Sequence, residues 1–130
     1  MGQYKVDATT QPGVLVIEIS GALSIEETRS FVLEHNAAID ALRGGSYRVF
    51  CDLRNMLPLS PEASQQFLIA KQYSAAHAKF QGSAVLVASS LIAMQHRRTS
   101  VEGGVMESEL ISDDEAACWA HLRRIQRPKQ

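Results

Sequence analysis

The sequence has 130 residues, of which 45% are hydrophobic and 21% charged, and its net charge is -1. This length fits one domain that buries a core without disulfides or structural metals. The near-neutral charge argues against a dedicated nucleic-acid-binding protein. No segment approaches the roughly 18 consecutive apolar residues of a membrane span. No apolar run follows a basic start, so we also expect no signal peptide.

The cysteines and histidines indicate a reducing compartment and no metal site. Cys51 and Cys118 each lie in an apolar segment, which is typical of small core residues in a cytoplasmic protein. A disulfide between them is not required, and they do not form a CxxC motif. No pair of histidines has metal-ligand spacing, so we predict neither a metal nor a cofactor. The histidines are His35, His77, His96 and His121.

The N-terminal segment predicts a β-hairpin followed by a helix. Residues 4–8 alternate in polarity, residues 11–13 form a turn, and residues 14–19 are rich in β-branched side chains. A capping box formed by Ser24 and Glu27 then opens a helix, and Gly44–Gly45 is expected to end it. Its predicted apolar face carries Ile25, Val32, Ile39 and Leu42.

The central segment repeats the pattern of strand and helix. Residues 47–53 form a strand, and Ser60 followed by Pro61 is a typical helix start. We expect this helix to end at Gln81–Gly82. Its predicted apolar face carries Ile69, Tyr73, Ala76 and Phe80.

The C-terminal segment predicts two more strand–helix units. Residues 84–88 form a short apolar strand, typical of a strand buried on both faces. Ser89 or Ser90 caps a third helix that ends at Gly103–Gly104. Residues 105–111 form a weaker strand, and a second capping box at Ser112 and Glu115 opens the last helix, which includes Trp119 and Leu122.

The order of elements is therefore ββαβαβαβα. Alternating strands and helices favour an α/β fold with a mostly parallel sheet of about five strands, four helices and an antiparallel N-terminal hairpin. We expect residues 1–125 to form one domain and residues 126–130 to form a basic, flexible tail.

A few polar residues lie where α/β folds place their sites. Asp52 closes a strand at its carboxyl end, where it either caps the following loop or faces a ligand. Ser60 and Ser90 precede helices, where serine is common as a cap, and no GxSxG motif accompanies them. The basic run 96–98 is interpreted as a solvated helix end that could also steer an acidic partner.

The order of elements and several short motifs resemble a STAS domain (sulfate transporter and anti-sigma-factor antagonist). The resemblance is to the small stand-alone STAS-like proteins of bacteria, some of which are likened to CRAL-TRIO lipid-binding domains. It runs from about residue 4 to residue 122 and implies a STAS-like sandwich. The motifs are residues 13–24 (GVLVIEISGALS), 50–54 (FCDLR), 59–63 (LSPEA), 84–88 (AVLVA) and 114–116 (DEA) with Trp119.

This resemblance implies a domain that binds partner proteins, in some cases under the control of phosphorylation. In anti-sigma-factor antagonists, the phosphorylated residue is the serine of an Asp-Ser pair at the start of the helix after the Asp-Leu strand. Here those positions are Ser60 and Pro61. Proline cannot be phosphorylated, which leaves Ser60 as the candidate phosphosite. A phosphate there would lie at a helix N-terminus, which favours anions.

Three classes of function remain open. The first is a protein-interaction module, forming a homodimer or binding another protein through an apolar surface patch. The second is a carrier that holds a lipid or nucleotide between the sheet and its helices, near Arg54, Ser60 and Ser90. The third is an enzyme, for which the sequence offers no convergent polar groups. We predict the first, a non-enzymatic regulatory module, with Asp52, Arg54, Ser60 and Ser90 as the candidate surface.

Overall fold

The structure, a computed structural model, describes residues 2–42 and 45–125. Within these ranges the chain forms a five-stranded mixed sheet, four α-helices and one short 3-10 helix. The predicted α/β fold class and the order ββαβαβαβα are confirmed. The elements are β1 (Gln3–Asp7), β2 (Val14–Gly21), α1 (Ile25–Ala41), β3 (Tyr47–Met56), α2 (Pro61–Ala76), β4 (Phe80–Leu86), α3 (Ser90–Gly103), the 3-10 helix η1 (Met106–Ser108), β5 (Glu109–Ser112) and α4 (Glu115–Ile125).

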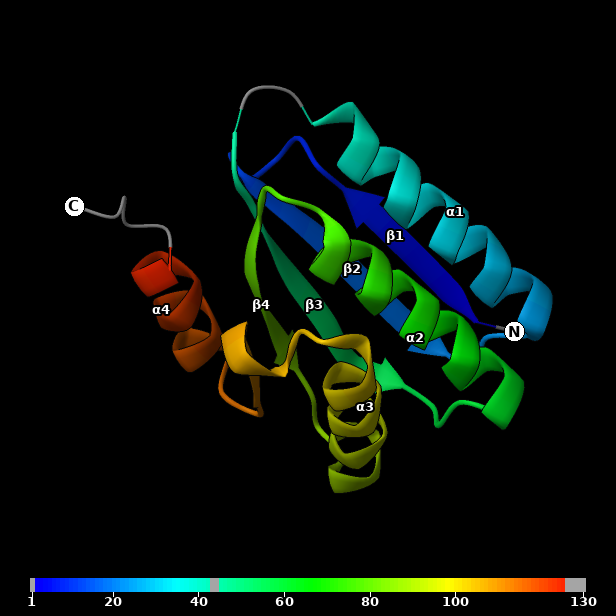
Figure 1. Cartoon of the computed structure of the whole chain (residues 1–130). Coiled ribbons are helices and arrows are strands. Elements are labelled where there is room, and N and C mark those ends of the chain that lie inside the picture. Colours follow the sequence, from blue (N-terminus) through cyan, green and yellow to red (C-terminus); the bar gives the residue numbers. More distant parts are fainter. Residues whose placement is uncertain (1, 43–44, 126–130) are drawn as a thin grey trace.

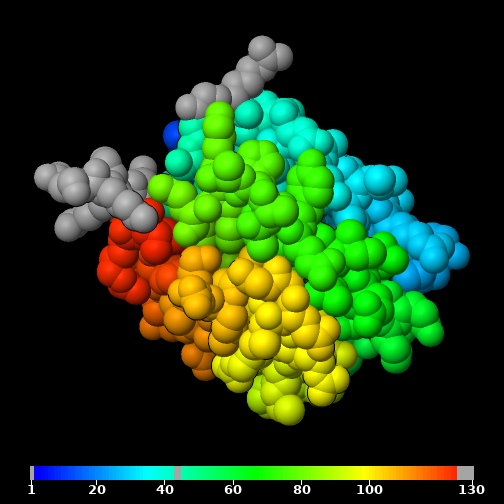
Figure 2. Space-filling model, in the orientation of Figure 1, coloured from blue at the N-terminus to red at the C-terminus, as the bar shows by residue number. Residues whose placement is uncertain are grey.

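Neighbouring strands of the sheet follow one another along the chain. β1 pairs with β2 in antiparallel fashion, and the pairs β2–β3, β3–β4 and β4–β5 are parallel. Parallel neighbours require a crossover connection, and α1, α2 and α3 provide one each. These three helices cover one face of the sheet, whereas α4 packs against the opposite face (Figure 1). Figure 2 shows the side chains of α1, α2 and α3 hiding most of the strands.

The sheet separates two apolar clusters, because successive side chains of a strand point to opposite faces. On β3, Val49 and Cys51 join the larger core beneath α1, α2 and α3, whereas Phe50 faces α4. Phe50 stacks on Trp119, with 4.3 Å between the ring centroids. Cys118 lies in the smaller cluster, so the two cysteines are on opposite sides of the sheet. Both are buried and free, which confirms that they are core residues.

The capping residues next to the helices determine where several of them begin and end. Ser24 Oγ accepts a hydrogen bond from Glu27 N over 3.0 Å, and the Glu27 carboxylate accepts one from Ser24 N over 2.8 Å. α3 ends on Gly104, whose φ of 83° is readily adopted only by glycine. The last residue of α1 is Ala41. Its C-cap is Leu42 in an extended conformation, so the helix ends before the predicted stop at Gly44–Gly45, of which Gly44 lies outside the described residues.

The predicted apolar face of α2 is wrong in part. Ile69 is 46% exposed, and Phe80 belongs to β4, where it pairs with Tyr47. The expected helix end at Gln81–Gly82 is also wrong, because α2 ends at Ala76 and both residues lie in β4. The buried residues follow a stripe at i, i+4, i+7 and i+11, and three of the four are small, which masks the stripe in a search for large apolar residues. They are Ala63, Phe67, Ala70 and Ser74.

The last strand and the last helix start later than predicted. The segment 105–111 contains the 3-10 turn η1, so β5 is limited to Glu109–Ser112. The cap of α4 is Asp114, whose carboxylate accepts hydrogen bonds from the backbone N–H groups of Ala116 and Ala117. Ser112 accepts from Asp114 N instead of capping the helix. The predicted tail, residues 126–130, lies outside the described residues.

Candidate functional site

Asp52 and Arg54 form an ion pair near the carboxyl end of β3. Being two residues apart, they project from the same face of the strand. The Arg54 guanidinium donates from Nε to Asp52 Oδ1 over 3.0 Å and from Nη2 to Oδ2 over 2.8 Å. The hydrogen bonds from Arg54 lower the pKa of Asp52, and the carboxylate raises the pKa of Arg54. Both groups are therefore charged at neutral pH, which suits binding better than proton transfer.

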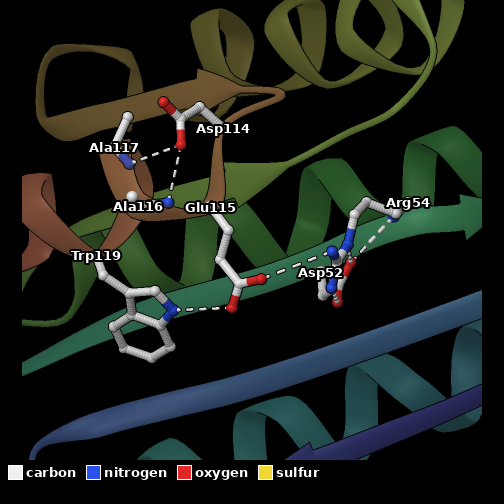
Figure 3. Close-up of polar contacts among 7 residues, drawn as sticks. All are labelled: Asp52, Arg54, Asp114, Glu115, Ala116, Ala117 and Trp119. Carbon is white, nitrogen blue, oxygen red and sulfur yellow. Dashed lines mark hydrogen bonds and ion pairs between the residues drawn. The ribbon is translucent and has the colours of Figure 1, made fainter.

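Glu115, the first residue of α4, adds a second carboxylate beside Arg54 on the same face of the sheet. Glu115 Oε1 lies 3.6 Å from Arg54 Nη1, and Glu115 Oε2 accepts a hydrogen bond from Trp119 Nε1 over 3.3 Å. In Figure 3 the Glu115 carboxylate lies between the indole of Trp119 and the Arg54–Asp52 pair. Two elements remote from each other in sequence, β3 and α4, therefore hold these groups in place, and the stacking of Trp119 on Phe50 ties α4 to β3. Sequence reasoning missed Glu115 as a partner of Arg54.

These residues line a surface groove of about 310 Å³ on the side of the sheet that carries α4. Its polar wall is predominantly acidic, since four carboxylates face two cationic side chains. The charged residues of the lining are Asp7, Glu18, Asp52, Glu115, Lys5 and Arg54. We call this the α4-side groove.

Ser60 lies at the exposed N-terminus of α2, away from that groove. Its hydroxyl accepts a hydrogen bond from Ala63 N over 3.2 Å, so it caps the helix as predicted. The loop before it is held by α3. Gln95 accepts from Leu59 N and donates to Leu59 O, both over 3.1 Å.

Ser90 is exposed at the start of α3, but it is not the cap of that helix. Ser89 has this role, and its hydroxyl accepts from Ile92 N over 3.4 Å. Ser90 lines a second surface hollow, of about 350 Å³, together with Arg97 and Asp113. The four predicted residues are thus not brought into one site. Asp52 and Arg54 share the α4-side groove, Ser90 lines the other hollow, and Ser60 lines neither.

Large apolar side chains are exposed near the N-terminus of α2. Leu57, in the loop before Ser60, is 54% exposed. On α3, Leu91 and Met94 are 52% and 64% exposed, and they flank Gln95, which binds the same loop. Leu91 and Gln95 are four residues apart and so share a face of the helix. We refer to Leu57, Leu91 and Met94 as the apolar edge.

A second polar cluster, missed by the sequence analysis, lies between α2, α3 and the sheet. Lys71 Nζ donates to His96 O over 2.9 Å and to Ser100 Oγ over 2.7 Å. Ser100 donates to one oxygen of the Glu109 carboxylate, and Ser83 donates to the other over 2.9 Å. Lys71 and Glu109 are therefore two charges bridged by a hydroxyl group.

Burial alters the pKa values of the groups in this cluster. Burial lowers the pKa of Lys71, although the charge of Glu109 opposes this effect. Burial, and secondarily the charge of Lys71, lowers the pKa of His96 well below 6.5. Burial raises the pKa of the neighbouring Cys51 thiol to about 12. His96 is only 2% exposed, so its interpretation as part of a solvated helix end is wrong.

The cluster forms part of the wall of a cavity of about 60 Å³ between the sheet and α1, α2 and α3. One feature of the sequence could have indicated this polar cluster. Lys71 follows Ala70 and lies four residues after Phe67, on the border of the buried stripe of α2. A lysine there has to bury its stem, and its ammonium group then needs acceptors from a neighbouring element.

Two further features bear on function. Among the described residues, no group of three or more His, Cys, Asp or Glu side chains is arranged to hold a metal ion. Within residues 2–42 and 45–125, no helix is both long enough and apolar enough to cross a membrane.

Comparison with known proteins identifies the fold. No protein-family model and no curated protein sequence matches this chain. Among solved structures, it is similar to an uncharacterised protein of the DUF3478 family from Shewanella loihica PV-4, which is described as having a SpoIIAA-like fold. The TM-score is 0.65 at 13% sequence identity, and the match covers 92% of this chain and 91% of the other. The fold of this chain is therefore SpoIIAA-like, that is, STAS-like, as the sequence motifs indicated.

Proposed function

We propose that this chain is a non-enzymatic regulatory module of the STAS type that acts by binding a partner protein. The observation that carries the proposal is the apolar edge beside the N-terminus of α2. Exposed large apolar side chains that cluster on a surface are typical of interaction sites. Leu57 is three residues before Ser60, and Gln95, which Leu91 and Met94 flank, binds Leu59 beside it. The resemblance to anti-sigma-factor antagonists aligns their phosphorylated serine with Pro61, so Ser60, one residue earlier, is the candidate for the regulated position.

The electrostatics of the α4-side groove also support binding. Asp52 and Arg54 neutralise each other within a strongly hydrogen-bonded pair, so neither group is poised to transfer a proton. A predominantly acidic groove favours partners with basic segments and disfavours nucleic acids. The apolar edge is therefore the proposed contact surface, and the acidic α4-side groove, on the face of the sheet that carries α4, is a separate charged surface that favours basic partners.

Ser60 is the proposed phosphosite of this module. Pro61 at the first helical position has no N–H group, and Ala63 N already binds the Ser60 hydroxyl. A phosphate on Ser60 would gain from the helix dipole and would be repelled by Glu62 in the first turn. Phosphorylation would therefore alter the charge of the surface beside Leu57 without requiring a change of fold.

The proposal places the protein in the cytoplasm, in keeping with its two free cysteines. A homodimer is one form that the proposed interaction takes. Native mass spectrometry of the purified chain distinguishes a homodimer from a complex with a different protein.

Site-specific photo-crosslinking tests the proposed surface. A photoreactive amino acid replaces Met94 on the apolar edge in one variant and Leu33 on α1 in the control. Both native side chains are highly exposed, at 64% and 71%, so neither replacement disturbs the core. In cells of the source organism we expect position 94 to crosslink one discrete protein and position 33 to give no matching band. Equal crosslinking from both positions, or none from position 94, would contradict the proposal.

The alternative, a carrier of a lipid or nucleotide, has weaker support. The cavity between sheet and helices measures about 60 Å³, whereas pockets for drug-sized ligands measure roughly 300–1,000 Å³. The larger hollows lie on the surface and are more polar. Native mass spectrometry also tests this alternative, because a co-purified lipid or nucleotide would appear as a discrete added mass.

A further inference from the structure

The cavity beneath α2 and α3 has an almost entirely apolar lining. Ile17, Val49 and Val85 from the sheet, together with Phe67 from α2, supply much of its wall. The imidazole of His96 meets the Phe67 ring edge to face, with 5.4 Å between centroids and an angle of 87°. His96 is one of six polar residues that border the cavity, together with His35, Lys71, Ser74, Ser83 and Glu109.

The protonation state of His96 follows from its neighbour. The ammonium group of Lys71 donates hydrogen bonds and cannot accept them. Lys71 Nζ lies 3.3 Å from His96 Nδ1, so Nδ1 acts as the acceptor. Burial keeps the imidazole neutral at pH 7 because it lowers the pKa of His96 well below 6.5. The single ring proton must therefore reside on Nε2.

That proton has no acceptor among the described residues. His96 Nε2 is buried and is the one buried side-chain nitrogen or oxygen without a hydrogen-bond partner in residues 2–42 and 45–125. An unpaired buried donor is destabilising, because it has lost its hydrogen bond to water without gaining another. The neighbouring polar groups are all paired, since Lys71, Ser100 and Glu109 bind one another. An acceptor atom within the cavity would remove the cost at Nε2.

The charges of the wall restrict the chemistry of that acceptor. Lys71 and Glu109 carry opposite charges and are bridged by Ser100, so the cluster is already balanced. An additional ion in an apolar cavity would lack a counter-charge and would be strongly disfavoured. The size is restricted as well. A volume of about 60 Å³ has room for roughly four to six water-sized groups.

We propose that this cavity binds a small, uncharged organic molecule through one acceptor oxygen, of a carbonyl or hydroxyl group, which accepts a hydrogen bond from His96 Nε2–H. The short apolar body of the ligand contacts Val49, Val85 and Phe67. This site is separate from the apolar edge and does not depend on the proposed partner binding.

The test uses the full chain labelled with ¹⁵N, and 2-butanone as the probe. The side-chain ¹⁵N signals of the histidines are recorded by NMR during a titration. We expect the His96 Nε2 signal and the amide signals around the cavity to shift in a saturable manner, with a dissociation constant in the millimolar range for so small a ligand. An unchanged His96 signal at about 100 mM 2-butanone would overturn the proposal.

Two matched valine variants locate the binding. Val85 lines the cavity, whereas Val87 is buried in the same core but does not line it. Val85→Ile adds a methyl group to the cavity wall, so we expect it to weaken 2-butanone binding by about tenfold. Val87→Ile should leave binding unchanged. Equal effects of the two substitutions, or no effect of Val85→Ile in a folded variant, would show that 2-butanone does not bind in this cavity.

A third variant distinguishes the contribution of the hydrogen bond from His96 from the contribution of the cavity volume. His96→Phe removes the donor, and xenon, which has no acceptor oxygen, then reports whether the cavity persists. We expect this variant to bind xenon but to lose the response of the cavity amides to 2-butanone. Retained 2-butanone binding would overturn the role of His96. If the variant does not fold, the two valine variants still decide the proposal.

Discussion

The ammonium group of Lys71 on α2 lies 2.7 Å from Ser100 Oγ on α3, to which it donates a hydrogen bond. The same Ser100 hydroxyl donates a hydrogen bond to the carboxylate of Glu109 on β5. One hydroxyl group therefore links two helices and an edge strand, and it separates two opposite charges in a poorly hydrated site. Such an arrangement makes the individual charges interdependent, because removing either one leaves the other without compensation.

Lys71→Met should destabilise the protein by roughly 2 kcal/mol. It retains most of the side-chain volume but leaves the Glu109 carboxylate without its cationic partner. The loss is expected to be smaller than for a fully buried pair, because Lys71 is only partly buried. Urea-induced unfolding followed by circular dichroism measures it.

The double variant Lys71→Met with Glu109→Gln is the control for that prediction. It removes both charges, so we expect it to be more stable than Lys71→Met alone. The single variant Glu109→Gln completes the comparison. If the loss of stability in the double variant equals the sum of the losses in the two single variants, the charges are not coupled through Ser100.

The stability of the protein should fall on mild acidification. Burial lowers the pKa of both His35 and His96 below 6.5 in the folded state. Between pH 7 and pH 5 the unfolded chain therefore binds protons that the folded chain does not, and the free energy of unfolding decreases. Each histidine contributes up to roughly 1 kcal/mol per pH unit in this window, and stability is retained above it.

Urea unfolding at pH 7, 6 and 5 measures this dependence. His35→Leu should reduce the slope, because it removes one of the two buried imidazoles from the folded state. A free energy of unfolding that is constant over these three values would show that the histidines are accessible to protons in the folded protein.

Ser60 has two separable roles, as a helix cap and as a proposed phosphosite. Ser60→Asn preserves a good cap and removes the hydroxyl group, whereas Ser60→Ala removes both. We expect Ser60→Ala to lose about 1 kcal/mol of stability and Ser60→Asn to lose little. If Ser60 is the regulated residue, Ser60→Asn should still abolish phosphorylation, which intact-mass spectrometry of protein from its own cells would reveal.

The variant Ser60→Asp tests the consequence for binding. Aspartate is also a favourable N-cap, so its effect on the crosslink from position 94 reports charge rather than helix stability. A crosslink that is the same with serine, asparagine and aspartate would remove Ser60 from the proposed mechanism.

Gly103 is required for the close approach of α2 and α3. A Cβ atom at this position would lie 2.8 Å from Lys71 Cβ, so Gly103→Ala should force the helices apart and cost about 1–3 kcal/mol. Gly45→Ala is the matched control, because among the described residues, its chain neighbours aside, no heavy atom lies within 4 Å of the place that its new methyl group would take. Thermal unfolding should show a lower midpoint for Gly103→Ala and no loss for Gly45→Ala.

Much of the local structure was accessible from short stretches of sequence. The capping box at Ser24 and the left-handed Gly104 each depend on a few adjacent residues, and both were predicted at the correct position. The errors arose where the local signal was ambiguous. The stripe of α2 is built largely from small side chains, and two acidic residues and a serine compete to cap α4, where the structure uses Asp114.

Contacts between the candidate residues were predictable only where one element carries both partners. Asp52 and Arg54 are two residues apart, so one strand suffices to bring them together. Their contact with Glu115, and the link of Lys71 to Glu109 through Ser100, join different elements. No spacing rule connects such positions.

The sequence by itself determined the order of elements, most helix starts and the STAS-like fold, because capping, β-branched runs and glycine stops act over a few neighbouring residues. Only the tertiary structure decided which polar residues meet. It placed Ser60 and Ser90 apart from the Asp52–Arg54 pair and buried His96 beside Lys71. The physical reason is that burial and charge pairing depend on how helices cross the sheet, and this packing arises from the whole core rather than from any one segment.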